Sequence, residues 1–216
     1  MNMEQKVAEL LLSINAVSFR FNPPYTYTTG LKSPIYIDNR IILSYPKVRD
    51  QIVDFYITTI KEKIGINKVE WISATATAAI PQGVLVADRL KIPLVYVRPT
   101  TKAYGKDGKV EGYLEKGKKV LIIEDHISTA TSVVGNAQAI RELGGIVKYC
   151  ITTTTYETQK STENLKNASI ELFSLTTAKT IIKTALQKGQ ISQKEKNSID
   201  AWFQDPPNWA QKFGFA

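Results

Sequence analysis

A short stretch near the middle of the chain carries the residues best suited to chemistry. Residues 120–132 read VLIIEDHISTATS, in which apolar residues lead into two adjacent acids and then into small, hydroxyl-bearing residues. The apolar run predicts a buried strand. Ligands of open parallel sheets sit beyond the carboxyl ends of the strands, so we expect Glu124 and Asp125 to face a ligand crevice.

The hydroxyl-rich segment after the acids predicts a phosphate site. Ser128, Thr129, Thr131 and Ser132 could donate hydroxyl groups, and we expect a helix to begin near Ser132. The start of a helix presents free backbone N–H groups and the positive end of its dipole. The neighbouring acids could hold a sugar diol, or a Mg²⁺ ion through its waters. The segment therefore predicts a loop that binds a ribose 5-phosphate, and simple helix capping is compatible with the same residues.

The surrounding elements follow the pattern of an α/β sheet. Residues 30–33 predict a hairpin between segments 25–29 and 34–38. Strands are expected at residues 68–75, 92–98, 118–125, 145–155 and 168–175. Helices are expected at residues 4–17, 45–64, 78–90, 132–145, 177–189 and 192–205. This alternation indicates a central, mostly parallel sheet flanked by helices.

Composition limits the class of protein. The chain has 216 residues, of which 43% are hydrophobic and 22% charged, so we expect one globular domain. No apolar run is long enough to predict a membrane span, and the N-terminus does not resemble a secretion signal. Cys150 is the single cysteine, which favours a cytoplasmic protein. The net charge of +8 suits anionic partners, but the lysines are scattered and no base-stacking pattern predicts nucleic-acid binding.

Residues 120–132 resemble the phosphoribosyl-pyrophosphate signature of the type I phosphoribosyltransferases, with hydrophobic, acidic and hydroxyl residues in the same order. Four longer segments resemble the bacterial orotate phosphoribosyltransferases: GLKSPIYIDNRIILSYPKVR, ATATAAIPQGVLVADRLKIPLVYVRP, KGKKVLIIEDHIST and IDAWFQDPPNW. The likeness runs from about residue 10 to residue 209. It implies the type I fold in a single domain, residues 1–216, with an N-terminal hood (residues 1–45) and a mobile lid loop (residues 98–117).

The resemblance also implies a reaction. Orotate and 5-phosphoribosyl 1-pyrophosphate would form orotidine 5′-monophosphate and pyrophosphate, as in pyrimidine (UMP) synthesis. Mg²⁺ would be the cofactor, bound mainly through substrate and water rather than directly by the protein. The lid would reach the neighbouring subunit's site, which implies a homodimer.

The resemblance assigns roles residue by residue. Lys102 and Asp125 are the expected catalytic residues. Orotate is expected to meet Ser128, Lys32 and Tyr156, although Lys32 could equally cap the hairpin. The phosphoribosyl pyrophosphate site is expected to contain Arg98, Lys102, Tyr104, Glu124, Asp125, His126, Ile127, Ser128, Thr129, Ala130, Thr131 and Ser132. Within this set, His126 occupies a variable position of the motif, and a catalytic role is not expected for it.

Several positions depart from the family pattern. In the lid, Thr100 replaces a lysine and Tyr104 a histidine, and each well-placed cation contributes roughly 2–4 kcal/mol to such a transition state. Relatives often have glycine at the positions of Ala74, Ala79 and Ala130, and a positive φ is unfavourable without glycine. Two alternatives therefore stay open: a non-catalytic regulator that binds phosphoribosyl pyrophosphate, and a phosphoribosyltransferase for another base.

Overall fold

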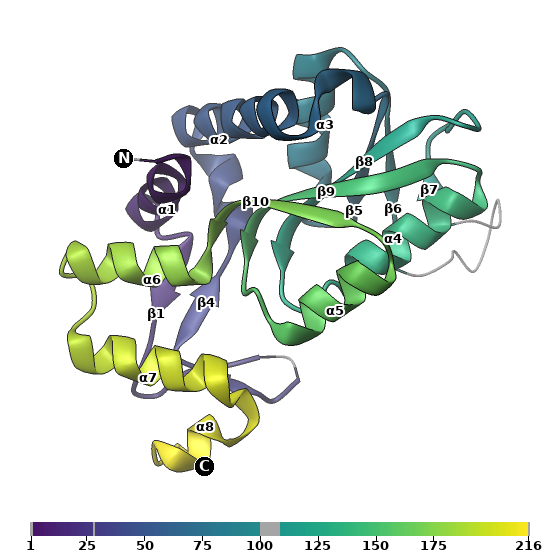
Figure 1. Ribbon diagram of the computed structural model, residues 1–216. Helices are drawn as coiled ribbons and strands as arrows, with labels where there is room; N and C mark the ends of the chain where they lie inside the picture. Colours follow the sequence, from purple (N-terminus) through teal and green to yellow (C-terminus); the bar gives the residue numbers. More distant parts are fainter. Residues whose placement is uncertain (1, 28, 100–108, 216) are drawn as a thin grey trace.

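The computed structural model of the protein describes residues 2–27, 29–99 and 109–215. At its centre is a sheet with the strand order β10-β9-β8-β5-β6-β7 (Figure 1). All neighbouring strands are parallel except β6 and β7, within the part of the chain that is described. The fold class expected from the sequence is therefore confirmed. The strands are β5 (Trp71–Thr75), β6 (Leu94–Val97), β7 (Val110–Glu111), β8 (Lys119–Ile127), β9 (Ile146–Thr155) and β10 (Glu171–Thr177).

Helices cover both faces of this sheet, and the central strand β8 shows why. Its side chains alternate between the faces, as in any strand. Leu121 and Ile123 enter the core beneath α1 (Met3–Ser13), α2 (Pro46–Thr59), α3 (Ile80–Leu90) and α6 (Ala178–Gln187). Val120 and Ile122 enter the core beneath α4 (Thr131–Glu142) and α5 (Gln159–Asn167). A strand buried on both faces must be continuously apolar, which is the pattern the sequence displays.

The N-terminal segment forms two small antiparallel sheets. Strand β1 (Val17–Phe19) pairs with β4 (Ile35–Ile37), and β2 (Tyr25–Thr26) pairs with β3 (Lys32–Ser33). A hairpin does surround residues 30–31, but the prediction that residues 34–38 form its second strand was wrong. Those residues pair with β1 instead, which places Ile35 in the core with no exposed surface.

Helices α1 and α5 (Gln159–Asn167) also differ from expectation. Helix α1 ends at Ser13 instead of continuing to residue 17, because Asn15 takes a positive φ of 55° and the chain then enters β1. Helix α5, between β9 and β10, was not predicted. Only Ser161 and Leu165 of this helix are buried, so it has little apolar periodicity to detect.

The C-terminal segment packs beside the N-terminal sheets. It contains α6, α7 (Gln193–Gln204) and α8 (Pro206–Lys212), one helix more than expected (Figure 1). Helix α8 contacts β3. Helix α7 begins with a capping box formed by Ser192 and Glu195. None of the helices in the described ranges is both long and apolar enough to cross a bilayer. The boundaries of the hood and the lid stay predictions, and residues 100–108 of the lid lie outside the described residues.

Candidate active site

The acidic pair lies near the end of β8, although the strand continues further than expected. Pairing with β9 runs on to Ile127 and Thr155, so Glu124 and Asp125 are still strand residues. Residues 128–130 then form a tight connection, and α4 begins at Thr131, one residue earlier than predicted. The strand-to-helix junction expected from the sequence is therefore present, with its turn displaced toward the helix.

The two acids occupy different environments. Glu124 is only 5% exposed, whereas Asp125 is half-buried. Burial and the neighbouring Asp125 carboxyl raise the pKa of Glu124 well above its usual range. Burial also raises the pKa of Asp125, and this rise is opposed by a hydrogen bond with Glu124 and by the charge of Arg40. A proton shared by the pair therefore favours Glu124, which leaves Asp125 as the better candidate for a charged ligand contact.

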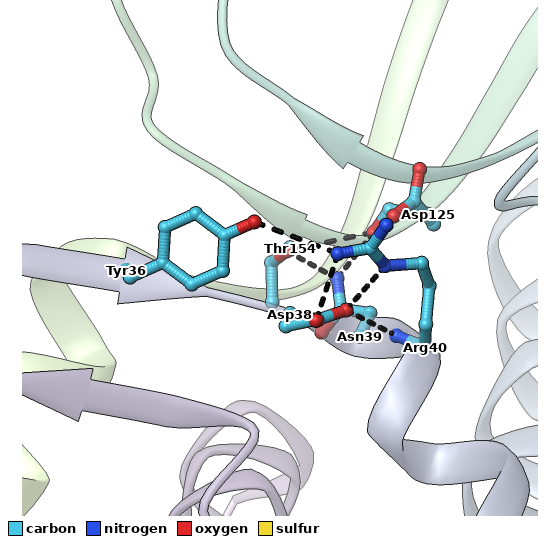
Figure 2. Close-up of polar contacts among 6 residues, drawn as sticks. All are labelled: Tyr36, Asp38, Asn39, Arg40, Asp125 and Thr154. Carbon is cyan, nitrogen blue, oxygen red and sulfur yellow. Dashed lines mark hydrogen bonds and ion pairs between the residues drawn. The ribbon is translucent and has the colours of Figure 1, made fainter. Parts of the chain in front are cut away.

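Residues 38–40 lie beside the end of β8, which Asn39 holds by hydrogen bonds, and none of the three was predicted as a site residue. The amide of Asn39 donates to the backbone oxygen of Asp125 and to Thr154 Oγ1, both at 2.7 Å (Figure 2). Arg40 forms a two-pronged ion pair with Asp38, at 2.6 and 2.8 Å. These three residues directly follow β4 (Ile35–Ile37). The polar run DNR after an apolar strand could have indicated that they belong to the site.

The loop after the acids is fastened by its carbonyl groups. Thr158 donates to the Ser128 oxygen at 2.6 Å, and Asn164 donates to the Thr129 oxygen at 2.8 Å. Ala130 has a φ of +62°, the left-handed conformation in which the family usually has glycine. This conformation costs a residue with a β-carbon about 1–2 kcal/mol. The carbonyl groups of Ser128 and Thr129 are thus already hydrogen-bonded to Thr158 and Asn164. The backbone amides of the first α4 turn remain available to a ligand.

The cavity beside this turn, which we call the α4 cavity, combines helix amides with cations. Its volume is about 290 Å³, and Thr131, Ser132, Arg98 and Lys109 line it. Arg98 is oriented by an ion pair of its Nε with Glu111, at 3.0 Å. Positive side chains facing a helix N-terminus suit a phosphate or pyrophosphate group. The predicted lid residues Lys102 and Tyr104, and the substituted Thr100, lie outside the described residues.

The turn between β5 and α3 also borders the α4 cavity, through Thr75 and Ala76. The peptide between Ala76 and Thr77 is cis. Ala79 has a φ of −85°, so the alanine found there is compatible with the backbone. Ala74 is fully buried, and a β-carbon added to Gly83 would approach its side chain to 2.7 Å. The absence of glycine is therefore unfavourable at Ala130 but not at Ala79.

A second cavity, the hood cavity, lies beneath the N-terminal sheets. Its volume is about 400 Å³, and it is lined by Thr26, Tyr27, Thr29, Tyr36, Ile37, His126, Ser128 and Tyr156. Ser128 and Tyr156 were predicted to meet a base and do line it. Among the described residues, Lys32 is not part of the lining, and its Nζ donates to Thr26 Oγ1 at 2.9 Å. Tyr36 also lines the hood cavity but was not predicted as a site residue, although it lies in the segment PIYID, which was predicted to form a strand.

His126 closes the hood cavity as a neutral side chain. Burial lowers its pKa to about 4. Its Nδ1 lies 2.8 Å from Thr154 Oγ1, and its ring meets the Tyr156 ring edge-on at 4.3 Å. Thr154 Oγ1 accepts a hydrogen bond from Asn39 and also lies 3.5 Å from the Asp125 backbone oxygen, so its hydroxyl group connects His126 to the strand end. Asn39, Thr154, His126 and Tyr156 thus form a continuous series of contacts from the strand end to the hood cavity.

Curated relatives match almost the whole chain. An orotate phosphoribosyltransferase from Coxiella burnetii is 40% identical over 209 residues, covering 97% of this chain and 99% of that protein. One from Enterococcus faecalis is 41% identical over 207 residues, covering 96% and 98%. The chain belongs to the orotate phosphoribosyltransferase family. No protein-family model matches it.

Solved structures agree with this family and fold. The crystal structure of orotate phosphoribosyltransferase from Aeropyrum pernix superposes with a TM-score of 0.74 and 26% identity, covering 86% of this chain and 99% of that one. The family resemblance inferred from residues 120–132 and the four longer segments is therefore confirmed. The individual site residues remain predictions.

Glu124 and Asp125 are the acids near the start of α4 that could contact a Mg²⁺ ion. Within residues 2–27, 29–99 and 109–215, no group of three or more histidine, cysteine, aspartate or glutamate side chains could hold a metal ion. Glu124 is buried with a raised pKa, so it is a poor ligand for a cation. Asp125 is less buried than Glu124 and is therefore the better suited of the two to contact a cation through water.

Proposed function

We propose that this chain converts orotate and 5-phosphoribosyl 1-pyrophosphate to orotidine 5′-monophosphate and pyrophosphate, in de novo pyrimidine (UMP) synthesis. One observation carries the proposal beyond the family likeness. Two cavities of different chemistry border the β8–α4 connection: the α4 cavity, with two cations in its lining, and the hood cavity, half of whose lining residues are aromatic. Ser128, which lines the hood cavity, and Thr131, which lines the α4 cavity, are only three positions apart.

The phosphoribosyl group is proposed to bind at the start of α4. Backbone amides of residues 129–132, together with the hydroxyl groups of Thr131 and Ser132, would bind phosphoryl oxygens. Asp125 would accept hydrogen bonds from the ribose hydroxyls. Arg98 and Lys109 line the same cavity and would bind pyrophosphate oxygens.

The base is proposed to bind in the hood cavity. The Tyr36 ring, 36% exposed, offers a surface on which a flat pyrimidine could stack. Ser128 and Tyr156 carry hydroxyl groups that can donate to carbonyl or carboxylate oxygens of orotate. Lys32 would have to release Thr26 to reach the ligand.

Catalysis would consist mainly of positioning and charge stabilisation. N1 of orotate forms a bond to C1 of the ribose while the bond from C1 to the pyrophosphate oxygen breaks. The electron pair of that bond leaves with pyrophosphate, and the N1 hydrogen is lost as a proton. Arg98, and Lys102 as the resemblance implies, would stabilise the charge that develops on pyrophosphate. Mg²⁺, when bound, supplies further positive charge to the same group.

Assembly and location follow the same family likeness. We infer a homodimer in which the lid, residues 98–117, contributes basic residues such as Lys102 to the partner's site, whereas Arg98 and Lys109 act in the α4 cavity of their own subunit. We also infer a cytoplasmic protein, since Cys150 is its single cysteine. Neither nucleic acid nor membrane is a proposed partner.

The decisive assay follows the disappearance of orotate in the presence of phosphoribosyl pyrophosphate and Mg²⁺. Turnover with orotate supports the proposal. Absence of turnover, together with tight binding of phosphoribosyl pyrophosphate by calorimetry, would favour a non-catalytic regulator, in line with the loss of lid cations at Thr100 and Tyr104. Turnover with uracil or a purine but not with orotate would assign the chain to another base.

A further inference from the structure

The C-terminal helix α7 reaches the N-terminal sheets through one tryptophan. Trp202 is 3% exposed, and its indole N–H donates to the backbone oxygen of Lys32 at 2.8 Å. These residues are separated by 170 positions in the sequence. The contact therefore fixes strand β3 from outside the N-terminal segment.

The strand that Trp202 holds supports one wall of the hood cavity. Lys32 pairs in register with Thr26 of β2, and the Lys32 side chain also donates to Thr26 Oγ1. Thr26 and the following Tyr27 line the hood cavity. Movement of β3 would therefore be transmitted to this wall.

The Trp202 ring supports two further cavity residues. It meets the Tyr27 ring at 6.3 Å and the Tyr156 ring at 5.8 Å, both in edge-to-face geometry. The hydroxyl groups of these tyrosines lie 3.2 Å apart, and Tyr27 also donates to the Ile35 oxygen at 2.9 Å. Trp202 itself is not among the described residues that line the cavity. Its influence on a ligand would therefore be indirect.

We propose that Trp202 is a positioning residue that sets the affinity of the hood cavity for orotate without touching it. It does so by fixing the Lys32 backbone and the rings of Tyr27 and Tyr156 before the base arrives. A wall that is already ordered loses less conformational freedom on binding, so the ligand binds more tightly. This inference rests on the proposed function, which assigns the hood cavity to the base.

Trp209 of α8 is a matched control. It is 1% exposed, and its indole N–H donates to the backbone oxygen of Ser198 at 2.9 Å. Its ring stacks on Phe213 and Phe215 of the same terminal segment. Trp202→Phe and Trp209→Phe therefore remove the same kind of hydrogen bond and a similar ring area. Only the first removes a hydrogen bond to β3, because Trp209 is bonded to Ser198 of α7, although its helix α8 also packs against β3.

The experiment measures kcat and both KM values for the full-length wild type and the two variants, with thermal unfolding of each. Trp202→Phe should raise the KM for orotate roughly five- to tenfold, the equivalent of one lost hydrogen bond, with the KM for phosphoribosyl pyrophosphate within about twofold. Trp209→Phe should lower the Tm but leave both KM values unchanged. An unchanged orotate KM in Trp202→Phe, or an equal rise in Trp209→Phe, would overturn the inference.

A measurement on the wild type covers the case in which Trp202→Phe fails to fold. The indole ¹⁵N–¹H resonances can be assigned with Trp71→Phe and Trp209→Phe. Orotate should shift the Trp202 resonance and leave that of Trp209 in place, and a static Trp202 resonance at saturating orotate would contradict the inference. If the wild type shows no turnover, the proposed function is wrong. The orotate-induced shift of the Trp202 resonance would then still show whether a base bound in the hood cavity affects Trp202.

Discussion

Asn39 joins the N-terminal segment to the strand end that carries Asp125, so Asn39→Ala tests whether this contact positions the acid. Asn39 is 1% exposed, and its amide donates to both the Asp125 oxygen and Thr154 Oγ1 at 2.7 Å. The substitution removes both hydrogen bonds. It also frees Thr154, which orients His126, from one of its partners.

The expected loss of stability can be estimated from these contacts. A neutral hydrogen bond contributes about 1 kcal/mol, so two of them contribute about 2 kcal/mol. The Asn39 Oδ1 atom has no hydrogen-bond partner within the described residues, so its removal does not add to the loss. For a chain of this length, 2 kcal/mol corresponds to a fall in Tm of roughly 4–8 °C. Because Asp125 loses one of the contacts that position it, the KM for phosphoribosyl pyrophosphate should rise roughly tenfold, the equivalent of one lost hydrogen bond.

Urea unfolding and steady-state kinetics measure the two effects of Asn39→Ala. Asn208→Ala is the control, because Asn208 is exposed and its amide donates to Asp205 at 2.9 Å. That substitution should change the free energy of unfolding by less than about 0.5 kcal/mol and leave kinetics intact. The reasoning fails if Asn39→Ala is as stable as Asn208→Ala, or if it is destabilised while its KM for phosphoribosyl pyrophosphate stays at the wild-type value.

Three further substitutions test the acid, the lid and His126. Asp125→Asn should raise the KM for phosphoribosyl pyrophosphate at least about tenfold in steady-state assays, and unchanged kinetics would remove Asp125 from the site. Lys102→Ala should lower kcat by about 30-fold or more with an unchanged Tm, and an unchanged kcat would show that the lid acts through other residues. His126 has a pKa lowered from 6.5 to about 4 by burial, so the unfolded state binds its proton first as pH falls. Between pH 6.5 and 4, the free energy of unfolding of the wild type should therefore fall by up to about 3 kcal/mol more than that of His126→Val. Urea unfolding at several pH values measures this, and an equal fall in both proteins would contradict it.

The strand-to-helix junction was predictable because its signals are local. A continuous apolar run predicts β8, and acids followed by hydroxyl residues indicate a loop at the start of a helix. The positive φ of Ala130 was also foreseeable, since the family usually has glycine there. The turn itself was displaced because pairing between β8 and β9 continues beyond the acids to Ile127.

The walls of the hood cavity could not be predicted in the same way. Trp202 and Lys32 are 170 residues apart, and Asn39 and Asp125 are 86 apart. No periodicity within a single segment reports such contacts. Tyr156 was expected near the base only from the resemblance, and its packing between His126 and Trp202 depends on the tertiary arrangement of three separate elements.

The most direct test of the proposed site is a crystal structure of the protein with orotidine 5′-monophosphate. The account predicts that the phosphate accepts hydrogen bonds from backbone amides at residues 129–132, that the ribose hydroxyls donate to Asp125, and that the pyrimidine lies in the hood cavity against Tyr36. A phosphate bound elsewhere, with the amides at the start of α4 turned away from it, would contradict the account.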